Sequence, residues 1–473
     1  MALRDDPHTR NSLQKRVLWP LALCVAAILP PLYLVWIVLT QTVDLPFADQ
    51  WALLPLLERS YAGTLTLRDL WAQHNEHRLL FPRLIMLALA RLSGWNTHVE
   101  MLVNIALAAG IFGVLAYQVR ATAGMTRMAW IFLLPALSLA IFSLNQAENW
   151  WGGWNIQIFL NVLAVSAGIV LLTQPARSWW TLALAALCGF VATYSYSTGL
   201  LIWPIGALAL LLTAARGSIR DWLRLGAWCA AGVIVIGSFF YAYIWNEQAP
   251  PLAAIVRNPR PYLLYTATYL GAPPTRGAVE YLFGVITGDV RAICNLGDSD
   301  LCSYVNSAAI TAGVGGLALF IIIAWALLRA CTLPTILPYL ALGGYALSTG
   351  VLTSLGRAVY GNHQALAQRY ATTTTLFWIA LLALCALCAQ VYADRRLVRV
   401  GALGIIALVT LLIGLSTLQG ADHFRWQYEF LAPARQELLL LNNDELLQRI
   451  YPDPQVVRDG AEVLRQHRLS VFR

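Results

Sequence analysis

The sequence predicts an all-α, polytopic membrane protein with about 11 transmembrane helices, and three observations lead to that prediction. Of the 473 residues, 59% are hydrophobic and only 12% are charged, a composition that water-soluble domains of this size do not have. The mean hydropathy is +0.61. The apolar residues also lie in long runs with few or no charges, which are typical of membrane-spanning helices.

Eleven apolar runs are predicted to cross the membrane. They lie at 17–40, 100–119, 128–144, 155–173, 178–193, 198–215, 225–245, 305–328, 334–353, 371–391 and 400–418. A further run, 79–93, would be about 22 Å long as a helix, which is short for a hydrocarbon core of roughly 30 Å. It also carries Arg83 and Arg91. It is therefore predicted to be an interfacial helix of the first outer loop.

The distribution of arginine sets the orientation of these spans. With the N-terminus inside, the short inner loops contain Arg120, Arg127, Arg177, Arg216, Arg220, Arg224, Arg329, Arg395, Arg396 and Arg399. This is the positive-inside pattern, so the net charge of +8 reflects topology and no nucleic-acid partner is expected. The first span is too long for a cleaved signal peptide. We expect a multi-pass protein of a bacterial inner membrane with a cytoplasmic N-terminus and a periplasmic C-terminus.

This topology divides the chain into four parts. They are a cytoplasmic N-terminus (1–16), a membrane core (17–215) whose first outer loop (41–99) carries the expected site, a second membrane region (216–418) with an outer loop at 246–304, and a periplasmic helical tail (419–473). The second large loop has Pro-rich turns, including Pro273-Pro274, and helix-like runs at about 261–271 and 278–286. It also contains Cys294 and Cys302. Because the periplasm is oxidising, we expect these two cysteines to form a disulfide.

The first outer loop holds the densest group of side chains capable of chemistry. Asp44 and Asp49 directly follow the first span, and a carboxylate there could take a proton from a hydroxyl. A carboxylate before a helix is also well explained as an N-cap. The segment that closes the loop contains His74, Glu76, His77 and Arg78, which could bind phosphate. It could instead hold a divalent cation, but no third ligand stands at a fixed spacing, so no metal site is predicted.

Two later outer loops add further candidates. Glu148 is the lone acid beside Trp150, Trp151 and Trp154, which form either an interfacial aromatic belt or a surface for stacking sugars. Arg357, Arg369 and Tyr370 bracket a short loop with no acid between the arginines. Anionic lipid headgroups or the phosphate of a polyprenol would both suit that positive site.

The order of these parts resembles the GT-C superfamily of membrane glycosyltransferases, which includes lipid A aminoarabinose transferases and protein O-mannosyltransferases. The resemblance covers roughly the first 215 residues and lies in Asp49-Gln50, where the family usually has Asp-Glu, and in the basic turn from Glu76-His77-Arg78 to Pro82. The run from Cys188 to Pro204 is similar to the family's hairpin of two short spans. The chain departs from the family at Gln50 and Arg78, and it lacks a large C-terminal soluble domain.

The resemblance implies inverting transfer of a sugar from a polyprenyl-phosphate donor to a glycan or lipid acceptor on the outer face of the membrane. Asp49 would be the general base, and Glu148 would help to place the acceptor. The expected site residues are Asp49, Glu148 and Asp44 for catalysis, Arg78, His77, Arg357, Arg369 and Tyr370 for the donor phosphate, and Glu76, His74, Trp150, Trp151 and Trp154 for the acceptor or sugar. No cofactor is predicted, and a divalent cation is the one alternative.

Two alternatives stay open at this point. An O-antigen ligase or polymerase acting on undecaprenyl-linked glycans would use the second large outer loop, which offers Arg257, Arg260, Arg276 and Arg291. A transporter of lipid-linked sugars would need polar residues within the spans and usually internal symmetry, and the spans have little of either.

Overall fold

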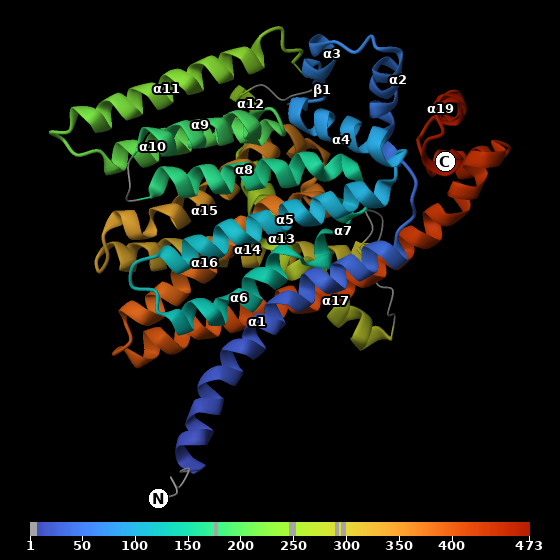
Figure 1. The fold of residues 1–473 in the computed structure, drawn as a ribbon. Coiled ribbons are helices and arrows are strands. Elements are labelled where there is room, and N and C mark those ends of the chain that lie inside the picture. Colours follow the sequence, from blue (N-terminus) through green and yellow to red (C-terminus); the bar gives the residue numbers. More distant parts are fainter. Residues whose placement is uncertain (1–6, 175–177, 246–251, 289–292, 295–298) are drawn as a thin grey trace, which may run out of the picture.

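The computed structural model describes residues 7–174, 178–245, 252–288, 293–294 and 299–473. Within these ranges the chain is a bundle of long helices with one two-stranded β-hairpin (Figure 1). Arg177 and Arg291, which the sequence analysis named, lie outside the described residues.

The predicted spans all correspond to helices. They are α1 (Pro7–Gln41), α5 (Thr97–Ala121), α6 (Arg127–Ile141), α8 (Ile156–Thr173), α9 (Trp179–Thr193), α10 (Ile202–Thr213), α11 (Ile219–Phe240), α14 (Ser299–Leu328), α15 (Leu333–Arg357), α16 (Ala371–Val391) and α17 (Arg396–Leu440). In the described part of the chain nine stretches are long and apolar enough to cross a membrane, and α9 and α10 belong to two shorter apolar helices. The chain is an all-α polytopic membrane protein.

The first outer loop is folded throughout. It contains η1 (Ala48–Leu53), α2 (Leu54–Ala62), α3 (Leu67–Trp71), the antiparallel strands β1 (Gln73–His74) and β2 (His77–Arg78), and α4 (Leu80–Ser93). Helix α4 is the short apolar helix that the sequence predicts. Its Arg83 is buried and donates hydrogen bonds to the carbonyls of Leu70 and Ala72. This arginine therefore supplies donors to carbonyl groups at the C-terminal end of α3.

Helix α13 (Arg260–Thr287) differs from the expectation for the second large loop. The sequence suggests two helical runs around Pro273-Pro274, but the structure has one continuous helix that packs against α14, α15, α16 and α17. A proline lacks the N–H that would bond to the carbonyl four residues before it. The carbonyl freed by Pro274 is that of Leu270, which accepts a hydrogen bond of 2.7 Å from Trp378 Nε1. Tertiary contact therefore keeps the helix intact.

The tail of the chain lies against the first outer loop (Figure 1). It comprises the end of α17, α18 (Asp444–Gln448), α19 (Pro454–Gln466) and η8 (Ser470–Phe472). The N–H of Ala48 donates to the carbonyl of Ile450 at 2.9 Å. A Cβ on Gly460 would lie 2.4 Å from the Trp51 ring, so α19 and η1 approach closely here. The tail thus supports the segment that carries Asp49.

Short elements connect the ends of the long helices. They are η2 (Leu144–Gln146), α7 (Ala147–Trp150), η3 (Gly153–Asn155), η4 (Ser197–Leu201), η5 (Ala358–Tyr360), η6 (Asn362–Leu366) and η7 (Gln368–Tyr370), together with α12 (Leu252–Arg257) before α13. Most of the candidate residues are on these elements and on the hairpin.

Candidate functional site

The β-hairpin of the first outer loop meets the end of α15. Asn75 forms the turn with a φ of 48°, and Glu76 follows it. The Arg357 Nη2 donates to Glu76 Oε1 at 2.9 Å, and both side chains are 42% exposed. Two of the predicted residues, one from each half of the chain, are therefore in direct contact at the outer ends of the helices.

His77 lies beside the connection between α9 and η4. The Ser197 N–H donates to His77 Nδ1 at 3.2 Å, the Ser197 hydroxyl is 2.9 Å from the same nitrogen, and the ring stacks on Tyr196 with centroids 4.0 Å apart. Removal from water lowers the pKa of His77 to about 4, and the Glu76 charge opposes that shift. The ring is therefore neutral near pH 7, so it can accept or donate a hydrogen bond but supplies no positive charge to a phosphate.

Tyr196 connects this contact to a second group of charges. Burial raises the pKa of Tyr196, and the nearby charges that act on it include Arg369, Glu76 and Arg357. Its hydroxyl stays protonated at neutral pH. Around Tyr196 lie His77, Glu76, Arg357, Arg369 and Tyr370. Glu148 joins this group through Arg369, and Asp49 joins it through His74, which lies near Glu76. We call these eight side chains, together with Tyr196, the outer polar cluster.

Glu148 and Arg369 form the other side of the outer polar cluster. Their closest side-chain atoms are 3.7 Å apart, and the Arg369 guanidinium lies 5.4 Å from the centre of the Tyr370 ring. The Glu148 N–H donates to Gln368 Oε1 at 3.3 Å, and Asn149 Nδ2 donates to the Arg369 carbonyl at 3.1 Å. These bonds hold α7 against η7, while the Arg369 side chain stays 47% exposed and can meet a ligand.

Asp49 is exposed in the first turn of η1. Within the described chain it makes no hydrogen bond or ion pair, so the N-cap alternative for this residue is not realised. Burial lowers the pKa of His74, whereas the Asp49 charge opposes that shift, which places the two side chains near each other. His74 also meets Trp154 edge to face at 4.9 Å.

The neighbour of Asp49 is anchored in the protein interior. Gln50 is 3% exposed, and its Nε2 donates at 2.8 Å to Glu100 Oε2, which is 1% exposed. A glutamate at position 50, which the family pattern suggests, would put two carboxylates together there. The amide instead donates a hydrogen bond to Glu100, which sequence reasoning had not selected.

Asp44 and Arg78 have structural roles that the sequence analysis did not expect. Asp44 accepts hydrogen bonds from the N–H and hydroxyl of Thr97 and forms an ion pair with Arg473. Arg78 is 4% exposed, and its guanidinium donates to the carbonyls of Phe239, Tyr241 and Trp71. Both charged groups are therefore bonded within the fold, and a catalytic Asp44 and a phosphate-binding Arg78 stay predictions.

The three tryptophans of the second outer loop separate from one another. Trp150 is fully buried, stacks on Phe159 at 4.5 Å and donates to the Ser143 carbonyl, so it is a core residue and not an acceptor platform. Trp151 packs near Phe424 and Trp426 of α17. Trp154, which contacts His74, is the tryptophan that lies beside the outer polar cluster.

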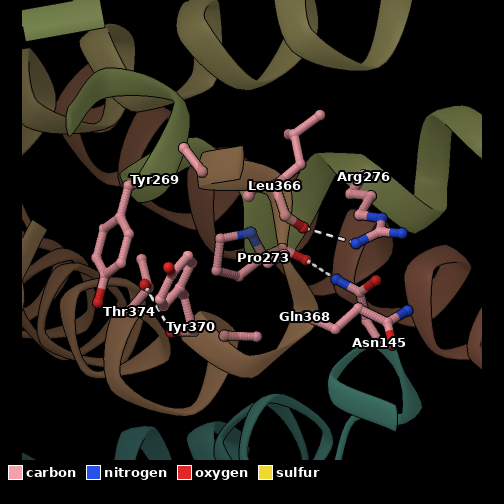
Figure 2. A pocket seen from close by; sticks show the side chains of 12 residues that line it. Asn145, Tyr269, Pro273, Arg276, Leu366, Gln368, Tyr370 and Thr374 are labelled. Atoms are coloured by element: carbon pink, nitrogen blue, oxygen red, sulfur yellow. Dashed lines mark hydrogen bonds between the residues drawn. The ribbon is translucent and has the colours of Figure 1, made fainter. Parts of the chain in front are cut away.

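A small pocket lies beside η7 and is lined in part by Gln368 and Tyr370. Figure 2 shows Tyr269, Thr374 and Tyr370 on one side of it, and Arg276, Gln368 and Asn145 on the other. Sequence reasoning mentioned Arg276 only for the ligase alternative and missed its buried partner, Glu280. The spacing of four residues, which puts an arginine and a glutamate on one face of a helix, is the signal that could have indicated them.

Two further expectations concern metal and disulfide sites. Among the described residues there is no group of three or more His, Cys, Asp or Glu side chains that could hold a metal ion. Cys294 and Cys302 are joined by a disulfide with their Cα atoms 4.9 Å apart, which is the pairing expected from the sequence.

Comparison with known proteins finds matches among solved structures but none among family models or curated sequences. The structure of ArnT from Cupriavidus metallidurans bound to undecaprenyl phosphate is similar over 94% of this chain and 88% of ArnT, with 14% identity and a TM-score of 0.47. The archaeal oligosaccharyltransferase AglB from Archaeoglobus fulgidus, in complex with an inhibitory peptide and a dolichol-phosphate, is similar over 93% of this chain and 61% of AglB, with the same identity and TM-score.

Proposed function

We propose that this protein is a membrane glycosyltransferase that moves a sugar from a polyprenyl-phosphate donor to a hydroxyl of a glycan or lipid acceptor. In this proposal it lies in a bacterial inner membrane, with its N-terminus in the cytoplasm and the outer polar cluster and residues 419–473 on the periplasmic side. Its partners are the lipid-linked donor, the acceptor and the surrounding lipids.

The observation that supports the proposal most strongly is that an unpaired carboxylate and two half-exposed guanidinium groups belong to one series of neighbouring side chains, the outer polar cluster. Asp49 is exposed and has no partner among the described residues, while Arg357 and Arg369 are each about half exposed. Transfer from a lipid phosphate requires a base for the acceptor and cations for the leaving group. The cluster provides both on one face of the helix bundle.

The chemistry follows from these groups. Asp49 takes the proton of the acceptor hydroxyl as that oxygen forms a bond to C1 of the sugar. The bond between C1 and the phosphate oxygen breaks, and the phosphate leaves with the electron pair. Arg357 and Arg369 neutralise the charge that develops on the phosphate. Because the acceptor attacks opposite the leaving group, the configuration at C1 is inverted.

The remaining residues of the cluster have supporting roles in the proposal. The hydroxyls of Tyr196 and Tyr370 donate hydrogen bonds to phosphate or sugar oxygens, and neutral His77 keeps Tyr196 in place through their stacking. Glu148, His74 and Trp154 bind the acceptor sugar in this proposal. Glu76 and Glu148 hold the two arginines until the phosphate replaces them as the partner.

The ligase or polymerase alternative depends on arginines of the second large loop, and one of them is already engaged. Arg276 is 9% exposed and bonded to Glu280 and to the Leu366 carbonyl. That alternative predicts an idle Asp49, so a single variant separates the two functions.

The test is mass spectrometry of surface glycans and polyprenyl-linked sugars in a deletion strain complemented with wild type, Asp49→Asn or Glu58→Gln. Glu58 is an exposed carboxylate of α2 in the same loop and serves as the matched control. The proposal expects one sugar to be missing from a glycan, its polyprenyl-phosphate form to accumulate, and only wild type and Glu58→Gln to restore it. Normal complementation by Asp49→Asn, with long glycan chains accumulating on the lipid carrier in the deletion strain, would favour the ligase or polymerase.

A further inference from the structure

A buried arginine holds the segment that carries Arg369 and Tyr370. Arg276 of α13 donates from Nη1 to the Leu366 carbonyl at 2.7 Å, and Figure 2 shows its guanidinium directed at that oxygen. Leu366 ends η6, three residues before Arg369. The position of the Arg369 backbone therefore depends on a contact made from the protein interior.

The orientation of Arg276 depends on Glu280, one turn further along α13. Arg276 Nε is 3.3 Å from Glu280 Oε1, and Glu280 is fully buried. His423 of α17 is on the other side, with its Nε2 3.5 Å from Glu280 Oε2. A buried guanidinium needs an opposite charge and full hydrogen bonding, so Glu280 fixes the direction in which Arg276 points.

Glu280 is in turn bonded to the disulfide segment. The Cys294 N–H donates to Glu280 Oε1 at 2.9 Å, and Cys294 is 8% exposed. The disulfide to Cys302 ties this N–H to the beginning of α14. A continuous series of contacts thus runs from the disulfide through Glu280 and Arg276 to Leu366.

We propose that Arg276 and Glu280 are positioning residues for Arg369, and that the Cys294–Cys302 disulfide keeps them in place, so that affinity for the lipid phosphate depends on the oxidised state. This inference rests on the proposed function, in which Arg369 binds the donor phosphate. Reduction by a dithiol transfers two electrons and two protons to the disulfide, which becomes two thiols while the dithiol becomes a disulfide. The Cys294 N–H is then free to leave Glu280.

The experiment measures binding of undecaprenyl phosphate to the detergent-solubilised full chain by thermophoresis. The main variant is Arg276→Met with Glu280→Leu, because replacing both charges leaves neither ion buried without a partner. We expect its Kd to rise about tenfold, since a small displacement of a binding group costs that much or more. The matched control is Arg425→Met with Asp422→Leu, an exposed ion pair of α17, which should bind like the wild type.

Two further measurements separate positioning from a general loss of structure. In an Arg369→Ala background, the Arg276→Met and Glu280→Leu changes should cause no additional loss of affinity, whereas effects from an unrelated disturbance would add. Reduction of the wild type with dithiothreitol, checked by thiol counting, should weaken binding in the same direction.

The outcomes are distinct. If the wild type does not bind undecaprenyl phosphate, the proposed function fails. If the wild type binds and the folded double variant binds equally well, or complete reduction leaves Kd unchanged, the inference is overturned while the proposed function stands. The reduction experiment decides alone if the double variant does not fold.

Discussion

The Glu76 carboxylate and the Arg357 guanidinium lie 281 residues apart in the sequence and 2.9 Å apart in the structure. They join the first outer loop to the end of α15. Because both side chains are about half exposed, the pair contributes little to stability. The pair keeps the Arg357 guanidinium within the outer polar cluster. An incoming phosphate can compete there with Glu76 for this guanidinium.

Glu76→Gln should therefore strengthen binding of undecaprenyl phosphate. The gain should be no more than about fivefold, because an exposed ion pair is worth at most about 1 kcal/mol. Titration of the purified variant, with thermal unfolding as a control, measures it. Weaker binding with an unchanged unfolding temperature would contradict the role given to Glu76.

Loss of charge at Arg369 should weaken lipid binding, whereas loss of charge at Arg78 should lower the stability of the fold. Arg369→Gln should lower affinity for undecaprenyl phosphate about tenfold or more with little change in the unfolding temperature, because its side chain is half exposed and charge-assisted contacts to phosphate are strong. Arg78→Met should lower the unfolding temperature, because the carbonyls of Trp71, Phe239 and Tyr241 lose their donor. Equal loss of affinity in two folded variants would return Arg78 to the phosphate site.

Much of the fold could be predicted from the sequence because it depends on local pattern. The apolar runs correspond to helices, and the short run with Arg83 and Arg91 is α4. The pairing of Cys294 with Cys302 also followed from the position of the two residues in one polar loop. These features require only hydropathy, length and spacing.

The roles of individual polar residues depended on contacts that no local pattern contains. Arg78 stands in a polar cluster in the sequence, but its acceptors Phe239 and Tyr241 come from the end of α11. Pro273-Pro274 suggests a break, but Trp378 of α16 supplies the missing hydrogen bond. Asp49 could be a cap or a free carboxylate by sequence alone, and the structure decides between these.

His77 should make the protein less stable in acid. Its pKa is lowered from 6.5 to about 4 in the folded chain, so between these values the unfolded chain binds more protons. This contribution is present above pH 6.5 and is lost as the pH falls towards 4. The neutral variant His77→Gln should unfold at a temperature that depends less on pH in this window. His363→Gln, at an exposed histidine, should keep the wild-type dependence, and an unchanged profile in His77→Gln would refute the assignment.

The tail should control the rate of transfer without changing donor affinity. Ala48, the residue before Asp49, donates its N–H to the Ile450 carbonyl. Gly460 of α19 lies directly against Trp51 and Leu54. A side chain at position 460 would displace the Trp51 ring, and we expect η1 and Asp49 to shift with it while Arg357 and Arg369 stay in place. Gly460→Val should thus slow glycan modification in the complemented strain by about a hundredfold, while the Kd for undecaprenyl phosphate stays within about twofold of wild type.

The comparison with a matched variant makes this prediction specific. Gly404→Val, on α17 with open space around it, should behave like the wild type in both measurements. Trp51→Leu, combined with Gly460→Val, removes the ring that the new side chain meets and should recover part of the lost rate, because mutations at contacting residues are not additive. If Gly460→Val instead weakens lipid binding and leaves the rate at saturating donor unchanged, the tail acts on the arginines and not on Asp49.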